Sequence, residues 1–229
     1  MGITTPVVWL IAGISGIVAT IIHFCRKPLN FIRNTDQRHL LVYLLCTLIP
    51  VIMVIRVHAV LYDDWRHLYF IYPSFVLLGL YALSLVRTSI YKMAVSSAIM
   101  LQVLVVCWDT ICLHPFEYIY FNRLTSHEPD FLRYNYEMDY WGTGYKQAFE
   151  YLIAHAPDHD IKVLWGLSPL THNAWALPSQ DKERIKFVYD NEAVYRITNF
   201  RSHAQDYPGE VYHDIKRQGS TIIRIYKLR

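Results

Sequence analysis

Charged residues are scarce in this sequence, and the motifs of soluble enzymes are missing from it. Only 18% of the 229 residues are charged, against roughly 25% in an average soluble domain, while 53% are hydrophobic. A disordered chain is therefore excluded, and a net charge of +3 gives no sign of a nucleic-acid partner. The absence of any Asn-x-Ser/Thr site suits a bacterial envelope protein.

Several kinds of active site are also missing. The sequence contains no glycine-rich phosphate loop, no Gly-x-Ser-x-Gly elbow, no His-Glu-x-x-His helix and no Cys-x-x-Cys pair. Its 4 cysteines all lie in or beside apolar stretches, so neither a disulfide framework nor a metal site is indicated. We expect no cofactor, with a divalent cation as the alternative left open by the acidic residues discussed below.

Charged and apolar residues are unevenly distributed along the sequence. Residues 1–114 hold 8 Lys and Arg and 4 Asp and Glu, whereas residues 115–229 hold 14 and 15. Four stretches of the first half reach the roughly 20 apolar residues needed to cross a bilayer core: Pro6–Phe24, Leu40–Leu61, Leu68–Val86 and Met93–Leu113. Because no basic residue precedes the first stretch, we interpret it as a retained helix rather than a secretory signal.

Basic residues in the short loops predict the orientation of these helices. They follow the first and third stretches and are Arg26, Lys27, Arg33 and Arg38, then Arg87 and Lys92. Because Lys and Arg are retained on the cytoplasmic side, both loops are expected in the cytoplasm and the Tyr62–His67 turn outside. The protein is therefore expected to be a multi-pass protein of the cytoplasmic (inner) membrane with both termini extracytoplasmic.

The second half has the pattern of a small soluble domain. A helical stripe runs from residue 143 to just before Pro157. Short strands are predicted at Ile161–Trp165, Ile185–Tyr189 and Ala193–Thr198, and a hairpin of Val211–Lys216 with Thr221–Lys227. A loop with a short helix is predicted at Gly166–Gln180. The predicted fold is membrane α-helical, with four transmembrane helices in residues 1–113, an aromatic connector along the membrane surface in 114–142, and a small extracytoplasmic α/β domain in 143–229.

The expected outward turn, Tyr62-Asp63-Asp64-Trp65-Arg66-His67, is the first candidate site. A guanidinium donates two hydrogen bonds to a phosphate at once, so Arg66 is suited to a lipid phosphate. Two alternatives stay open. In the first, the turn is polar only because any hairpin turn must be, and Asp64 pairs with Arg66. In the second, the adjacent carboxylates bind a divalent cation or act in acid–base chemistry.

Two further clusters follow the last apolar stretch. The first runs from His114 to Asn122 and is explained either by an aromatic belt or by a surface for a sugar or lipid head group. The second is Asp139-Tyr140-Trp141-Gly142, in which Asp139 is placed to cap the following helix and Gly142 to permit a tight turn.

Together these clusters, in their order and spacing, resemble the C-terminal half of bacterial multi-spanning glycosyltransferases of the C type. That superfamily includes protein O-mannosyltransferases and the aminoarabinose transferase of lipid A. The outward turn with the following Leu68–Pro73 resembles the family's turn leading into a helix, and the other two clusters resemble its post-membrane signature. The resemblance covers about Val51 to Arg229.

The resemblance implies that a sugar passes from a polyprenyl-phosphate carrier to an acceptor hydroxyl on the outer face of the membrane. Such a reaction needs a base for the hydroxyl and positive charge for the leaving phosphate. The substrate-binding residues expected on this basis, with Arg66 and His67 on the carrier phosphate, are Arg66, His67, Asp64, Tyr120, Asn122, Asp139, Tyr140 and Trp141.

The sequence departs from the family pattern at the front. In full-length relatives the catalytic acidic residue lies on a large exterior loop after the first membrane helix, and no such loop is found here. The catalytic residue is thus unknown, and we expect the chain to be inactive without a companion polypeptide that carries the missing half. The alternative is a non-catalytic membrane protein that binds a lipid-linked sugar or scaffolds an envelope complex. A transporter is disfavoured because Arg56 and Asp109, the charges within the stretches, both lie near stretch ends.

Overall fold

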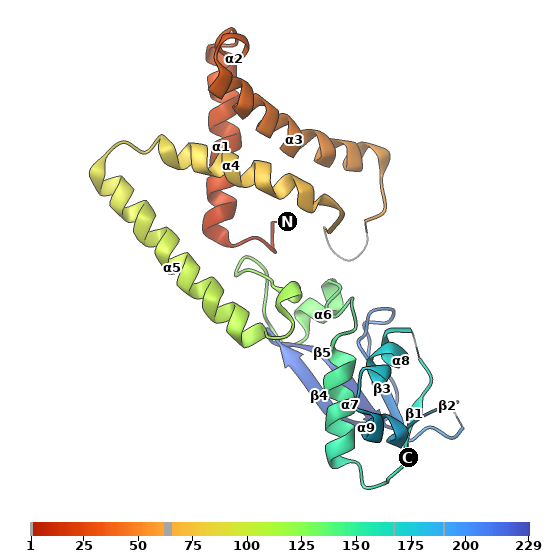
Figure 1. Ribbon diagram of the computed structural model, residues 1–229. Coiled ribbons are helices and arrows are strands. Elements are labelled where there is room, and N and C mark those ends of the chain that lie inside the picture. The colour runs from red at the N-terminus through yellow and green to blue at the C-terminus, as the bar shows by residue number, and fades with distance from the viewer. Residues whose placement is uncertain (1, 62–65, 167, 190) are drawn as a thin grey trace. The chain divides into compact units, whose positions relative to one another are not determined.

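A computed structural model of the protein describes residues 2–61, 66–166, 168–189 and 191–229 (Figure 1). The chain divides into two compact units. The helical unit comprises Met1–Cys112 and Phe121–Leu124, and the sheet unit comprises Leu113–Tyr120 and Thr125–Arg229. Residues of the predicted connector, 114–142, are therefore divided between the two units.

The helical unit is built from apolar helices. Within the described residues, four helices are long and apolar enough to span a membrane: α1 (Val7–Arg26), α3 (Thr35–Val57), the continuous helix Arg66–Ser84 and α5 (Ser89–Leu113). The third begins as the 3₁₀ helix η1 (Arg66–Ile71) and becomes α4 (Tyr72–Ser84) next to Pro73, whose missing N–H is tolerated in a first turn. The prediction of four helices of this kind is confirmed.

Capping shifts one helix from its predicted limits. α3 starts at Thr35 rather than near Leu40 because the side-chain oxygen of Asn34 accepts hydrogen bonds from the backbone N–H groups of Asp36 (2.9 Å) and Gln37 (3.4 Å). The same helix ends before His58, whose backbone is left-handed (φ 51°). A short helix, α2 (Asn30–Arg33), occupies the loop between α1 and α3.

Small residues bring α1 and α4 into close contact. A Cβ atom added at Gly16 would lie 2.0 Å from the backbone carbonyl oxygen of Leu78, and one added at Gly13 would lie 2.1 Å from the ring of Phe75. Thr20, one turn further along α1, is also buried and donates its hydroxyl hydrogen to the carbonyl of Gly16 (2.8 Å). Stripes of small residues allow this approach of two backbones in membrane helices.

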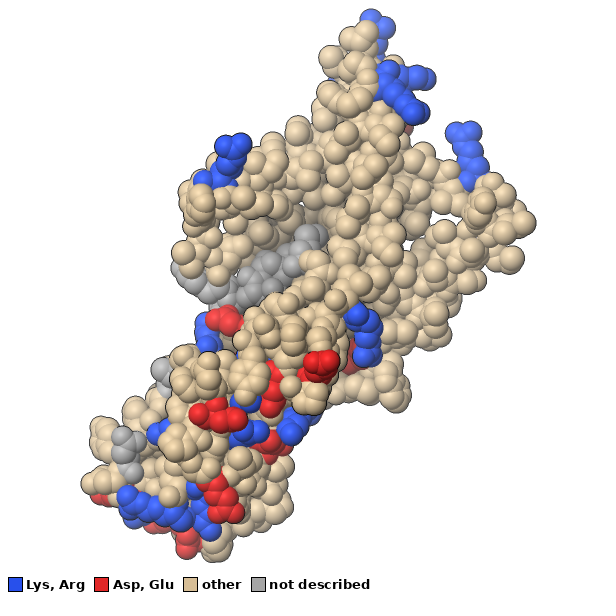
Figure 2. Space-filling view, turned by 180° about the vertical axis from the view of Figure 1, so that it is seen from behind, with Lys and Arg blue, Asp and Glu red and all other residues tan. Residues whose placement is uncertain are grey.

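The other faces of these helices are apolar and exposed. No residue of the most apolar window of α5 is buried, and Ile90, Met100 and Ile111 on this helix are 70%, 63% and 71% exposed. Figure 2 shows large surfaces free of charged side chains, with Lys and Arg gathered at a few places on them. Exposed apolar surface of this extent, on helices that satisfy their own backbone hydrogen bonds, indicates a membrane-associated protein.

The sheet unit contains one mixed sheet. Its strands, in the part of the chain that the structure describes, are β1 (Ile161–Leu164), β2 (Ile185–Val188), β3 (Tyr195–Thr198), β4 (Glu210–Arg217) and β5 (Ser220–Lys227), in the order β2-β1-β3-β5-β4. β1 pairs in parallel with both β2 and β3, whereas β5 pairs antiparallel with β3 and β4. The predicted strands and hairpin are confirmed, with ends shifted by no more than two residues.

Helices cover the sheet and form the core with it. α7 (Gly144–His155), the predicted helix, contacts β3 and β5 through a face on which Ala148, Phe149 and Leu152 are fully buried. α8 (Ser168–Trp175) packs on α7, and α9 (Ser179–Arg184) contacts β2. Two shorter helices, η2 (Glu117–Ile119) and α6 (Phe131–Asn135), lie in the region predicted as connector.

Candidate functional site

A buried carboxylate at the start of α7 joins two of the predicted clusters. Asp139 is 1% exposed, and its carboxylate accepts hydrogen bonds from the hydroxyl of Tyr118 and from the backbone N–H groups of Thr143 (2.9 Å) and Gly144 (3.0 Å). Thr143, the residue before the helix, makes no capping bond to the helix with its own side chain. Asp139 therefore satisfies amides of the first turn of α7, as a helix N-terminus requires.

Asn199, the residue after β3, ties this centre to the sheet. Its side-chain amide donates to the backbone carbonyl of Asp139 (2.8 Å), and its side-chain oxygen accepts from the hydroxyl of Tyr145 on α7 (3.1 Å). Arg201 adds a second link, because its Nη1 donates to the backbone carbonyl of Tyr140 (2.7 Å). The Asp139–Tyr140 backbone is thereby fixed at the carboxyl end of β3.

Burial controls the protonation of this centre. Burial raises the pKa of the Asp139 carboxyl above its ordinary value, against the opposing effect of the hydrogen bonds from Tyr118 and the backbone. Burial and the neighbouring Asp139 charge raise the pKa of Tyr118 far above its ordinary value. Tyr118 consequently keeps its proton at neutral pH and donates a hydrogen bond to Asp139. This pair holds the local structure and offers no solvent-accessible base.

Cavities adjoin this centre in the sheet unit. One of about 230 Å³ is lined by residues 133–138, by Asn199–Arg201 and by Ala204. Another, of about 210 Å³, lies at the ends of β1 and β3 and has Trp165, Thr198 and Asn199 among its walls. Asn199 is a wall of both, so the anchoring of this residue also shapes the two cavities.

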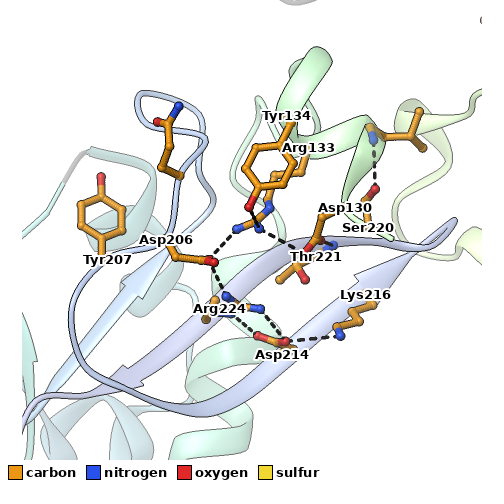
Figure 3. A network of polar contacts seen from close by, with 12 residues as sticks. Asp130, Arg133, Tyr134, Asp206, Tyr207, Asp214, Lys216, Ser220, Thr221 and Arg224 are labelled. Carbon is orange, nitrogen blue, oxygen red and sulfur yellow. Dashed lines mark hydrogen bonds and ion pairs between the residues drawn. The ribbon is translucent and has the colours of Figure 1, made fainter. Parts of the chain in front are cut away.

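A network of ion pairs lies beside the first cavity (Figure 3). The side chain of Arg133 is 2% exposed and donates to Asp130 (3.0 Å) and Asp206 (2.9 Å). The side chain of Arg224 on β5 is 10% exposed and donates to Asp214 (2.5 and 2.9 Å) and to the same oxygen of Asp206. One carboxylate thus bridges two guanidinium groups that are nearly removed from water.

This network anchors the loop between β3 and β4. The ring of Phe200 lies 4.2 Å from the guanidinium of Arg133 and 5.9 Å from that of Arg224, in cation–π geometry. The hydrogen bond from Arg133 lowers the pKa of Asp206 below its ordinary value, so Asp206 is ionised at neutral pH. The negative charge of Asp206 therefore faces the positive charges of Arg133 and Arg224. This pairing of opposite charges marks the network as a structural anchor.

Two residues of the expected outward turn, Arg66 and His67, are described, and they belong to the helical unit. Arg66 and His67 are the first two residues of η1; Arg66 is half-buried and His67 is exposed. Asp64, with the rest of residues 62–65, lies outside the described residues. The contact of Arg66 and His67 with a carrier phosphate stays a prediction.

The remaining predicted residues lie in different environments. Asn122 is fully buried in the helical unit, where its side-chain amide donates to the backbone carbonyls of Gly2 (2.8 Å) and Thr5 (2.6 Å). It fastens the segment Phe121–Leu124 to the start of the chain. In the sheet unit, Trp141 is 51% exposed, whereas Tyr120 is half-buried and Tyr140 is buried.

In the part of the chain that the structure describes, no group of three or more His, Cys, Asp or Glu side chains is arranged to hold a metal ion. Asp63 and Asp64, which motivated the alternative of a divalent cation, lie outside that part.

Several residues that build the sheet-unit centre were not predicted from the sequence. They are Tyr145, Asn199 and Arg201, together with the Arg133–Asp206–Arg224 bridge, whereas Tyr118 lies in the predicted cluster from His114 to Asn122. The one available signal was the pairing of a polar residue with the end of a predicted strand, which Asn199 after β3 shows.

Comparisons with known proteins add no relative. No protein-family model, no curated protein and no solved structure matches this chain.

Proposed function

We propose that this chain is the C-terminal portion of a membrane glycosyltransferase that moves a sugar from a polyprenyl-phosphate carrier to an acceptor on the outer face of the membrane. The ordered motif set described above supports the proposal, and so does the succession of four apolar helices and a small mixed-sheet unit. A carrier lipid is held in the bilayer, so an enzyme that uses it must combine membrane helices with groups at the interface.

The observation that carries the proposal is the position of Arg66 and His67. They begin the apolar helix Arg66–Ser84, so in a bilayer they lie at the level of the lipid phosphates. A guanidinium forms charge-assisted hydrogen bonds to phosphate oxygens and stabilises the charge that develops on a leaving phosphate. Arg66 is the proposed contact of the carrier phosphate, with His67 beside it.

The proposed acceptor base comes from outside residues 1–229. Asp139 is buried and bonded to Tyr118 and to α7, which suits it to bracing the site and not to removing a proton from an acceptor. A companion polypeptide carrying the acidic exterior loop of the family would supply the base. A reading frame beside this one that encodes apolar spans and an acidic exterior loop supports this; unrelated neighbours count against it.

The same observation on Asp139 favours one second candidate. In this candidate the chain is a non-catalytic protein that binds the lipid-linked sugar, because Asp139, the carboxylate of the described centre, is buried. Sugar transfer by the chain together with its companion distinguishes the transferase from this candidate, since both predict binding.

The binding test uses the full chain in lipid nanodiscs with polyprenyl-phosphate mannose and with polyprenyl phosphate alone. The double variant Arg66→Ala, His67→Ala is expected to weaken binding of both about 10- to 100-fold, since a hydrogen bond to a charged group contributes roughly 1.5–3 kcal/mol. The matched control is Arg87→Ala, Lys92→Ala, which changes one basic residue between α4 and α5 and one in the first turn of α5, both on the predicted cytoplasmic side. Equal losses in the two double variants, or no loss in the first, would remove the proposed site.

A further inference from the structure

The second cavity of the sheet unit occupies a place in the fold where ligands recur. β1 lies between β2 and β3 in the sheet. After β1 the chain forms β2 on one side of β1 and then β3 on the other side, so the order of the strands reverses between β1 and β3. In open sheets with parallel strands, ligands bind beyond the carboxyl ends of the strands at such a point. The cavity of about 210 Å³ lies there: Trp165 follows β1, and Thr198 ends β3.

Trp165 also forms a wall of another cavity. This cavity, of about 360 Å³, is lined by Leu164, Trp165, Tyr189 and Asn191. The indole of Trp165 is held from one side by the ring of Phe187, with centroids 5.6 Å apart and planes at 75°, and its backbone N–H donates to the carbonyl of Val188 (2.8 Å). Even so, Trp165 is 56% exposed. A fixed aromatic ring therefore stands at the wall of two hollows.

The walls combine aromatic faces with hydrogen-bonding groups. Tyr189, in the larger cavity, is 79% exposed. In the smaller one the guanidinium of Arg196 lies 4.7 Å from the ring of Tyr207, and Thr198 and Ser202 add hydroxyl groups. Exposed aromatic rings next to such polar groups suit a ligand with an apolar C–H face and a rim of hydroxyls, which is the chemistry of a sugar ring.

Other ligand classes fit these walls less well. Among the described residues that line the two cavities, Arg196 is the one with a charged side chain, so a cation finds no opposite charge and a polyphosphate finds a single one. Pro169 lies in the first turn of α8, the helix that follows β1, and removes an N–H that a bound phosphate would use. A cavity of about 210 Å³ is also smaller than the roughly 300–1,000 Å³ of drug-sized ligands, and so suits a single ring.

We propose that the carboxyl edge of β1 and β3 binds a glycan, with one sugar ring in each of the two cavities that share Trp165. The site lies within the sheet unit and does not depend on the carrier contact of Arg66. If the proposed function holds as well, this glycan is the acceptor of the transferred sugar.

The test measures binding of free oligosaccharides to the full chain in nanodiscs, which avoids detergents with sugar head groups. The probes are a glycan array of neutral and uronic-acid-containing chains, followed by titration of the best disaccharide and of the corresponding monosaccharide. We expect binding of at least one glycan class, tighter for the disaccharide than for the monosaccharide. Trp165→Ala should weaken it tenfold or more, and Trp165→Phe less.

The matched control is Trp175→Ala, since Trp175 is 63% exposed and lines neither cavity. Two results would overturn the proposal: no glycan of the array binds, or Trp175→Ala weakens binding as much as Trp165→Ala. The double variant of Arg66 and His67 should leave free-glycan binding unchanged. Failure of this proposal and failure of the proposed function are thereby distinguishable.

Discussion

Replacing Arg133 with methionine removes a buried charge while keeping most of the side-chain volume. The change leaves Asp130 without its guanidinium partner, leaves Asp206 with Arg224 alone, and removes the nearer cation from the face of Phe200. Breaking a buried ion pair by removing one partner costs about 3–5 kcal/mol. Asp206 is 51% and Asp130 24% exposed at the side chain, so both regain some water, and we expect a loss near about 3 kcal/mol, at the low end of that range.

The measurement is hydrogen exchange of β5 peptides in the full chain, which reports the free energy of opening of the sheet unit. The control is Lys146→Met on α7, which removes an ion pair with Glu150 at 3.8 Å in which both side chains are 54% exposed. Pairs of this kind contribute about 0–1 kcal/mol. If the two substitutions lower the opening free energy equally, the buried network does not stabilise the unit as we argue.

Three further predictions address packing, pH and topology. Gly16→Ala places a Cβ 2.0 Å from a backbone oxygen of α4, so thermal unfolding in nanodiscs should show a loss of about 1–3 kcal/mol, whereas Gly2→Ala, with open space around it, should show none. The hydrogen bond from Arg133 lowers the pKa of Asp206, so the contribution of Asp206 to stability is complete above the ordinary carboxyl pKa of 3.8 and is lost as the pH falls through the lowered pKa. Asp206→Asn should therefore reduce the acid dependence of hydrogen exchange in β5. An unchanged pH profile would contradict the assignment. A reporter fused after Leu113 should be active only outside the cytoplasm, and a cytoplasmic signal would reverse the predicted orientation.

Local patterns in the sequence predicted most of the elements. Apolar and polar residues alternate in Tyr195–Thr198, and this period of two predicted β3. In the structure Tyr195 and Ile197 are buried and their neighbours are half-buried. Almost every residue of β5 is buried, since it lies between β3 and β4, and its position was predicted instead from the hairpin pattern of Val211–Lys216 with Thr221–Lys227. The capping by Asn34 lies outside any hydrophobic period, which is why the start of α3 was placed too late.

The candidate site was much less predictable, because it depends on contacts between distant parts of the chain. Asn199 and Asp139 are 60 residues apart in sequence, and Arg133 and Asp206 are 73 apart. Composition and periodicity carry no information on such pairs. That β1 pairs with both β2 and β3 is likewise a property of the folded sheet, and the cavities at its edge follow from that pairing.

The hydrogen bond from Tyr118 to Asp139 has a practical consequence for anyone who wishes to excise the sheet unit. A cut at residue 142, the boundary suggested by the sequence, would discard both the donor and the acceptor and leave the first amides of α7 to the solvent. Phe116, which is fully buried beneath Arg217, would be lost with them. A fragment meant to fold by itself should begin at Leu113, so that the stretch directly after the last apolar helix travels with the sheet it belongs to.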